Sequence, residues 1–322
     1  MLASAARLKQ VAMVELPGNP GFNQVAIANG QVVITRPETN TIEIFNPVKR
    51  RVVARISQVQ NPRGIAVDDA ASRVYIALAG SNRVAVVNST NWQVERLIPV
   101  KSTPEKLLWV PETGTLFVSS LLDRSLGILD LRLGIETANI DLNALPQDMI
   151  YDPARQQLLV SLQDLNQVAA VDRSGHITQR FKFMAWEPTG LALDSNRRRL
   201  YVAVRYAVLI LNADTGAELS RIPAPGGTDA LSLDPADNLL YAASGDGSVL
   251  AIDLVRGVAD YELPTDVKGY SLAYDSSHKM LFFPGGREGK AKLMILRPVS
   301  ANQPNAPQNA ENSGDRQQTA KK

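Results

Sequence analysis

Five aspartates recur at one phase of a repeating pattern, and converging carboxylates could act in acid–base catalysis or hold a metal ion. They are Asp68, Asp152, Asp194, Asp234 and Asp275. Each follows an apolar run and precedes a turn, where an aspartate accepts hydrogen bonds from backbone N–H groups just ahead of it. A catalytic group is expected to break a repeat, so we interpret this set as turn-forming. The same interpretation applies to Asn46, Asn88, Asp130, Asp172, Asn212 and Asp253, which end a later run of each copy.

Composition excludes several other kinds of chemistry. The 322 residues contain no cysteine and only two histidines, His176 and His278, which excludes thiolate chemistry and a histidine-rich metal site. No nucleophile elbow, phosphate-binding loop or haem-attachment motif is present. The formal net charge of +2 is too small for a nucleic-acid-binding coat, although basic runs stand at 49–51 and 197–199. Nucleic-acid binding is therefore not expected.

A repeat of about 41 residues runs through the chain and predicts the elements that position these side chains. Its clearest copy has short β-favouring runs at 64–68, 74–77, 83–88 and 93–98, separated by turn residues. Seven copies of four runs predict an all-β fold, a seven-bladed β-propeller of four-stranded antiparallel blades. No run shows a sustained helical period, so helices are expected to be nearly absent.

The seventh copy has only three runs, and the missing strand is found at the other end of the chain. Residues 11–17 resemble residues 258–264, the last run of the sixth copy. We therefore expect the N-terminal strand to close the last blade and protect its open edge. The expected organisation is a flexible lead over 1–6, a propeller over 7–297 and a disordered polar tail over 298–322.

The strand pair at 73–88 resembles the YVTN-type β-propeller repeat, and the resemblance covers roughly residues 7–297. It implies the propeller fold but does not choose a function, because related propellers include secreted surface proteins, periplasmic proteins and lactonases. The first and third copies depart from the pattern, with Ala28 and Pro111 in place of the usual aspartate.

The sequence also bears on the cellular location of the protein. The small residues at 1–6 are of the kind that end a secretory signal, but the segment that should precede them is absent. A periplasmic or secreted location is favoured and a cytoplasmic one stays open. No apolar run is long enough to span a membrane, and a monomer is expected.

In a propeller, the turns from an outer strand into the next inner strand open at one mouth of the central channel. The loops between second and third strands open at the same mouth. The functional candidates are therefore expected in the turns that lead into the inner strands. Loops on a rigid scaffold often carry function, although they are also polar simply because they face water. The aligned ring holds Asn23, Arg63, Lys106, Gln147, Thr189, Asp229 and Tyr270. Arg36 belongs to the second-to-third-strand loops of the same face. The residues expected to bind a ligand or partner are Arg63, Lys106, Trp186, Arg205, Asp229, Tyr270 and Arg287.

The sequence therefore favours a non-enzymatic scaffold that binds a protein segment or a small polar ligand at the channel mouth. The alternative is a lactonase-like, divalent-metal-dependent hydrolase, by analogy with propellers that hold an ion at the channel mouth. Asn23, Glu105, Asp148 and Asp229 could supply oxygen ligands for a hard ion such as calcium. No other cofactor is expected. Both histidines fall in turns of the opposite face, which argues against a histidine base at the mouth.

Overall fold

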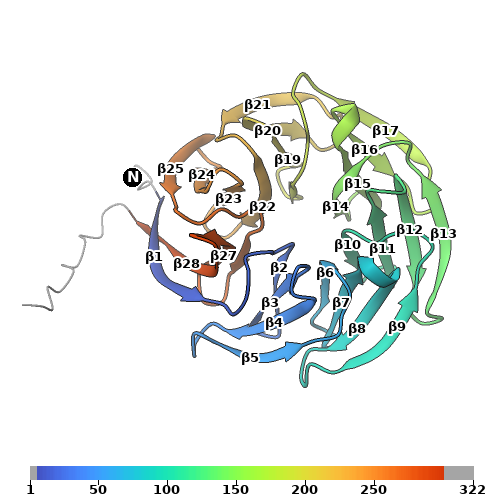
Figure 1. Cartoon of the computed structure of the whole chain (residues 1–322). Helices are drawn as coiled ribbons and strands as arrows, with labels where there is room; N and C mark the ends of the chain where they lie inside the picture. The colour runs from blue at the N-terminus through green and yellow to red at the C-terminus, as the bar shows by residue number, and fades with distance from the viewer. Residues whose placement is uncertain (1–5, 301–322) are drawn as a thin grey trace, which may run out of the picture.

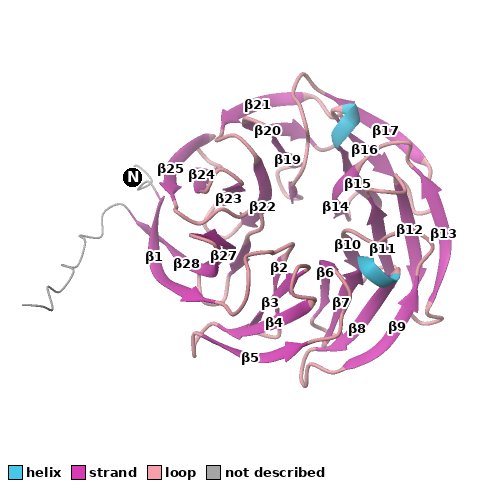
Figure 2. Ribbon diagram, viewed as in Figure 1, coloured by secondary structure: helices cyan, strands magenta, loops and turns pink. Residues whose placement is uncertain are grey.

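Seven antiparallel sheets of four strands each are arranged around a central axis in the computed structural model, which describes residues 6–300 (Figure 1). Nearly all the regular structure in this part of the chain is strand, and the two helices are single 3₁₀ turns, η1 (Ala79–Ser81) and η2 (Gln163–Leu165) (Figure 2). Neither helix is long or apolar enough to cross a membrane. The predicted all-β propeller is confirmed.

Each blade uses four strands that follow one another along the chain, except the last. Blades 1 to 3 comprise β2 (Val25–Ala28), β3 (Gln31–Arg36), β4 (Thr41–Asn46) and β5 (Arg51–Ile56); β6 (Pro62–Asp68), β7 (Arg73–Leu78), β8 (Arg83–Asn88) and β9 (Val94–Pro99); and β10 (Leu107–Val110), β11 (Thr115–Ser120), β12 (Ser125–Asp130) and β13 (Ile135–Asp141). Blades 4 to 6 comprise β14 (Pro146–Asp152), β15 (Gln157–Leu162), β16 (Gln167–Val171) and β17 (Ile177–Lys182); β18 (Leu191–Asp194), β19 (Arg199–Val204), β20 (Ala207–Asn212) and β21 (Glu218–Pro223); and β22 (Thr228–Asp234), β23 (Leu239–Ser244), β24 (Ser248–Asp253) and β25 (Val258–Pro264). Blade 7 comprises β26 (Ala273–Asp275), β27 (Met280–Arg287), β28 (Lys290–Ser300) and, from the other end of the chain, β1 (Ala6–Glu15).

The N-terminal strand closes the ring, as the sequence predicts. β1 pairs antiparallel with β28 from Ala6 opposite Ser300 to Glu15 opposite Lys292, with one irregularity between Gln10 and Ala12. Figure 1 shows β1 and β28 side by side, blue against orange-red. β28 runs three residues past the boundary expected at 297, while the remainder of the expected lead and tail, 1–5 and 301–322, lies outside the described residues.

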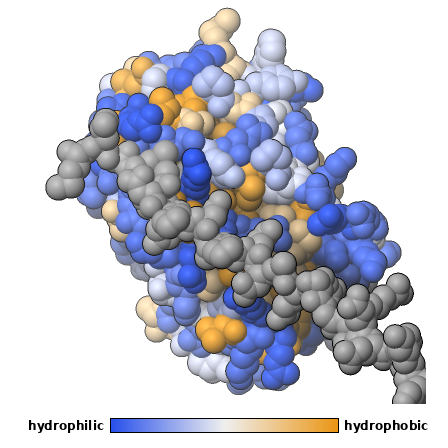
Figure 3. All heavy atoms as spheres, turned by 90° about the vertical axis from the view of Figure 1, so that its left-hand side faces the viewer, coloured by the Kyte–Doolittle hydropathy of each residue, from blue (hydrophilic) through white to orange (hydrophobic). Residues whose placement is uncertain are grey.

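The core lies between neighbouring blades and not inside any one sheet. The middle strands are buried on both faces, as in β7 and β24, whereas the outer strands alternate between half-buried and exposed residues, as in β5 and β13. One cluster joins Val33 and Ile44 of blade 1 to Ile65 and Ile76 of blade 2. This arrangement explains why continuous apolar runs fill the middle of each repeat and alternating runs end it. The outer surface over blade 7 and its neighbours is mainly hydrophilic (Figure 3).

The recurring aspartates form turns, as predicted. Asp68 Oδ1 accepts a hydrogen bond from the backbone N–H of Ala71 at 3.1 Å, and Asp194 Oδ1 accepts one from Arg197 at 2.9 Å. The residues that end the third strands do the same, and Asp253 Oδ1 accepts from Val255 at 2.7 Å. Each such bond satisfies a turn N–H that has no partner in the sheet, which is why aspartate or asparagine recurs there.

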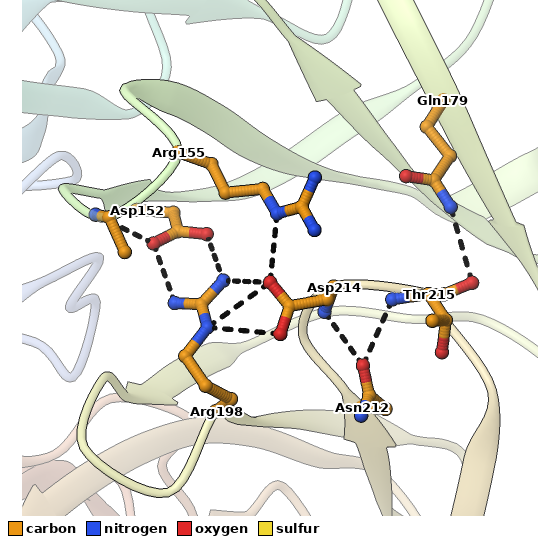
Figure 4. Close-up of polar contacts among 8 residues, drawn as sticks. Asp152, Arg155, Gln179, Arg198, Asn212, Asp214 and Thr215 are labelled. Atoms are coloured by element: carbon orange, nitrogen blue, oxygen red, sulfur yellow. Dashed lines mark hydrogen bonds and ion pairs between the residues drawn. The ribbon is translucent and has the colours of Figure 1, made fainter.

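Asp152, one of the turn aspartates, also joins blade 4 to blade 5 on the face opposite the channel mouth. Arg198 lies between Asp152 and Asp214 and donates to both carboxylates, while Arg155 reaches Asp214 from the other side (Figure 4). Arg198 Nη1 and Nη2 lie 2.8 and 2.7 Å from the two oxygens of Asp152, whose side chain is 0% exposed. Much of the basic run at 197–199 is thus neutralised, because Arg197 also pairs with Asp194 at 2.9 Å.

Candidate functional site

Buried hydroxyl groups hold the start of two inner strands against the blade before each of them, and this fixes two positions of the ring of residues at the mouth. Thr35 Oγ1 of blade 1 donates to the carbonyl of Arg63 at 2.7 Å, and Ser161 Oγ of blade 4 donates to the carbonyl of Thr189 at 2.6 Å. Both hydroxyls are fully buried. The backbone at these ring positions is therefore set by contacts between blades.

The channel is narrow and polar. A space of about 100 Å³ lies among the inner strands, where Lys106, Gln147, Asp148, Thr189, Asp229 and Tyr270 line it. The two oxygens of Asp148 accept hydrogen bonds at 2.9 Å from the backbone N–H groups of Met149 and Leu191. Of the residues expected to bind a ligand or partner, Lys106, Asp229 and Tyr270 therefore lie together in the channel.

The two channel carboxylates are influenced by the same lysine. Burial raises the pKa of Asp148, and the nearby Lys106 ammonium together with two backbone N–H bonds acts in the opposite direction. Burial also raises the pKa of Asp229; Lys106 opposes that rise and the charge of Asp148 adds to it. Lys106 is the cation with the largest effect on both groups. The channel thus holds two carboxylates and one ammonium in a confined space.

A second space, which we call the blade 7–1 cavity, opens beside the channel between blade 7 and blade 1. It has a volume of about 420 Å³ and is lined by segments 20–23, 37–38, 268–271 and 284–286 and by Arg63. Arg63 Nη1 and Asn23 Nδ2 both donate to Glu105 Oε1, at 3.1 and 3.3 Å. Tyr270 lines both this cavity and the channel, and its hydroxyl donates to the carbonyl of Phe22.

A third space is an open groove of about 430 Å³ between blades 4 and 5, which we call the Trp186 groove. Its walls are Phe183 to Trp186, Val204 to Ala207, Asn166, Arg221 and Pro223. Met184, Trp186 and Tyr206 are 89%, 67% and 59% exposed, and large side chains exposed together around one groove are typical of an interaction site. The Arg205 guanidinium lies 5.7 Å from the centre of the Tyr206 ring.

Two arginines expected at the mouth have other surroundings. Arg287 lines none of these three spaces; it forms an ion pair with Asp266 at 3.0 Å and contacts the sulfur of Met13. Arg36 is only 1% exposed and binds the linker between β1 and β2, where it donates to the carbonyls of Pro17 and Asn19. Sequence reasoning missed this anchoring role, because nothing in the repeat indicates that the linker folds back over Arg36.

The proposed oxygen ligands for a metal ion fall into two separate groups. Glu105 and Asn23 are hydrogen-bonded to each other beside Arg63, while Asp148 and Asp229 line the channel with Lys106. Within residues 6–300 no group of three or more His, Asp or Glu side chains is arranged to hold a metal ion. The calcium site stays a prediction.

Comparison with known proteins places the fold. No family model matches the chain. Antigen Lp49 of Leptospira interrogans serogroup Icterohaemorrhagiae serovar copenhageni (strain Fiocruz L1-130) is 22% identical in an alignment of 284 residues, which covers 82% of this chain but only 61% of that protein. A chain of a solved structure titled Kuenenia stuttgartiensis Hydrazine Synthase matches 91% of this chain and 99% of its own length, with a TM-score of 0.75 and 15% identity. The chain is therefore a seven-bladed β-propeller that shares its fold with that structure.

Proposed function

We propose that this protein is a YVTN-type propeller that acts as a non-enzymatic binding scaffold and engages a segment of a partner protein in the Trp186 groove. We place it in the periplasm or outside the cell. The description of its relative from Leptospira as an antigen supports that location.

The observation that carries the proposal is the exposure of Met184, Trp186 and Tyr206 around one groove on the mouth face. Trp, Tyr and Arg are the residue types most often found where partner proteins bind tightly. Covering a side chain of this size stabilises a complex by about 1.5 to 3 kcal/mol. Most of the groove wall comes from the β17–β18 loop and the β19–β20 hairpin, which are anchored in the core at Phe181 and Val204.

The occupant we infer is a segment that presents a large apolar side chain next to a carboxylate. The apolar side chain fits between Trp186 and Tyr206. The carboxylate pairs with Arg205, whose own partner Glu187 lies at 3.3 Å with both side chains 50% exposed. An ion pair as exposed as this one contributes little stability and is readily exchanged for another carboxylate.

A random peptide-display selection on the intact chain tests this proposal. Selected peptides are expected to combine a large apolar residue with a neighbouring Asp or Glu, and to lose at least about tenfold in affinity for the Trp186→Ser variant. Leu122→Ser is the matched control, because Leu122 is 80% exposed and lies outside the groove. Peptides that bind the Trp186 and Leu122 variants equally well would contradict the assignment.

A metal-dependent hydrolase is the second candidate, and the two carboxylates of the channel favour it. Lys106 argues against it, because its ammonium already lies close to both carboxylates and offsets part of their charge. Thermal melting during a calcium titration separates the two functions. We expect no saturable rise in melting temperature for the native chain. A saturable rise that disappears in the Asp229→Asn variant would favour the hydrolase.

A further inference from the structure

The blade 7–1 cavity has the features of a binding site that is separate from the Trp186 groove. Three prolines and the ring of Tyr270 provide apolar walls, with Pro20 and Pro37 on the blade 1 side and Pro284 on the blade 7 side. Two glycines let the walls of this space pack closely: a Cβ on Gly286 would approach Pro20 to 3.0 Å, and one on Gly21 would overlap Glu38. Such a mixture of apolar walls and a few polar groups is typical of small-molecule sites.

Asn23 supplies an acceptor that has no partner. Its side chain is only 6% exposed, and its Oδ1 is buried without a hydrogen bond to any described residue. The amide orientation follows from Glu105, because Nδ2 donates to Oε1 of that carboxylate and a flipped amide would set two oxygens against each other. A buried acceptor left in this way is unfavourable, and Asn23 lines the cavity, so a hydroxyl bound there that reached Oδ1 would relieve this cost.

Arg63, on the neighbouring blade, supplies a hydrogen-bond donor. Its Nη1 and Nε donate to Glu105 and Asn61, but Nη2 has no hydrogen-bond partner within residues 6–300. Asn23 and Arg63 are adjacent because both bind the same oxygen of Glu105. A ligand group that both donates and accepts could therefore contact the two side chains together.

The charges around the cavity are balanced. Arg63 is paired with Glu105, while Glu38 and Lys268 add one further charge of each sign and have no side-chain hydrogen bond or ion pair with any described residue. A charged ligand would meet a like charge as well as an opposite one. A neutral ligand with several hydroxyl groups meets no such conflict, because each hydroxyl has one donor and two acceptor positions.

We propose that the blade 7–1 cavity binds a neutral saccharide. One sugar hydroxyl donates to Asn23 Oδ1 and accepts from Arg63, further hydroxyls bind Glu38 and Lys268, and the C–H face of the ring packs on Tyr270 and the prolines. The site does not depend on the proposed binding of a protein segment, because the two spaces share no lining residue.

Saturation-transfer NMR on the intact chain tests the proposal with a panel of neutral monosaccharides and their methyl glycosides. Nicotinamide serves as a neutral amide probe and glutamate as a charged probe. We expect at least one sugar to bind saturably with a millimolar dissociation constant. The Arg63→Gln and Glu38→Gln variants should each weaken it about tenfold or more.

The controls separate this site from the groove. Arg83→Gln changes an exposed arginine that lines neither space, and it should leave sugar binding unchanged, as should Trp186→Ser. Three results would overturn the proposal: no sugar binds the native chain, sugar binding is unaffected by both cavity substitutions, or nicotinamide or glutamate binds at the cavity more tightly than any sugar. Because Glu38 pairs with no described group, its variant is expected to fold even if Arg63→Gln does not.

Discussion

A chain that lacks residues 1–17 will lose more than about 5 kcal/mol of stability and will tend to aggregate. The deletion removes β1, its ladder with β28, and the buried side chains of Leu8 and Leu16, each of which contributes about 1.5 to 3 kcal/mol. It also removes Pro17, whose carbonyl binds the buried Arg36. The exposed edge of β28 becomes a template for pairing with another chain.

Thermal melting measures this loss, and a drop of more than about 10 °C is expected. A chain that lacks only residues 1–5 keeps β1 and is the control for shortening. A finer comparison substitutes Leu8→Asp, where the side chain is 4% exposed, against Gln10→Asp in the exposed part of the same strand. Equal melting temperatures for the 1–17 deletion and the shorter control would show that the ring does not depend on this strand.

Replacing Arg198 by methionine is expected to cost about 3 to 5 kcal/mol. Its guanidinium binds both oxygens of Asp152, a carboxylate that is 0% exposed, so the variant leaves a buried charge without its cation. Arg155→Met is the matched control, because Arg155 is 49% exposed and its loss leaves the Asp152–Arg198 pair intact. That variant should lose less than about 1 kcal/mol.

The Arg198→Met variant should also change how the stability of the protein depends on acid pH. The hydrogen bond from Arg198, followed by that from Arg155, lowers the pKa of Asp214 from 3.8 to about 2. The folded state therefore binds this proton less tightly than the unfolded state, and the resulting stabilisation is present above pH 3.8 and lost as the pH falls toward 2. Urea unfolding between pH 5 and pH 2 should show a smaller acid-induced loss for Arg198→Met than for the native chain. If Arg198→Met is as stable as Arg155→Met, the buried pair is not important for stability.

The backbone was largely predictable, because the repeat determines it. The period places every strand, and the turn aspartates follow from the need to satisfy turn N–H groups, as at Asp68 and Asp253. The missing strand of the seventh copy and the matching strand at the N-terminus together predict closure, which the β1–β28 ladder confirms.

The side-chain partners at the mouth were less predictable. The ring alignment brings Lys106, Asp229 and Tyr270 to the channel and Arg63 to the adjoining cavity, because residues at one phase of the repeat face the axis. The ion pairs among these side chains do not follow from the repeat. Glu105 binds Arg63 of the preceding blade, and this contact depends on side-chain conformation. Phe183 and Met184 resemble core residues in sequence, and only the three-dimensional path of the β17–β18 loop shows that they line a groove. Arg287 pairs with Asp266 and lines none of the three spaces described above.

Amide hydrogen exchange of the intact chain, with and without a peptide selected on it, tests most directly whether the Trp186 groove is the binding surface. Binding is expected to slow exchange in segments 183–186 and 204–207, where the backbone N–H of Arg205 already donates to the carbonyl of Trp186 at 3.0 Å. The rest of the ring should exchange as before. Protection confined to other blades, or to the face that carries Asp152 and Arg198, would contradict the account.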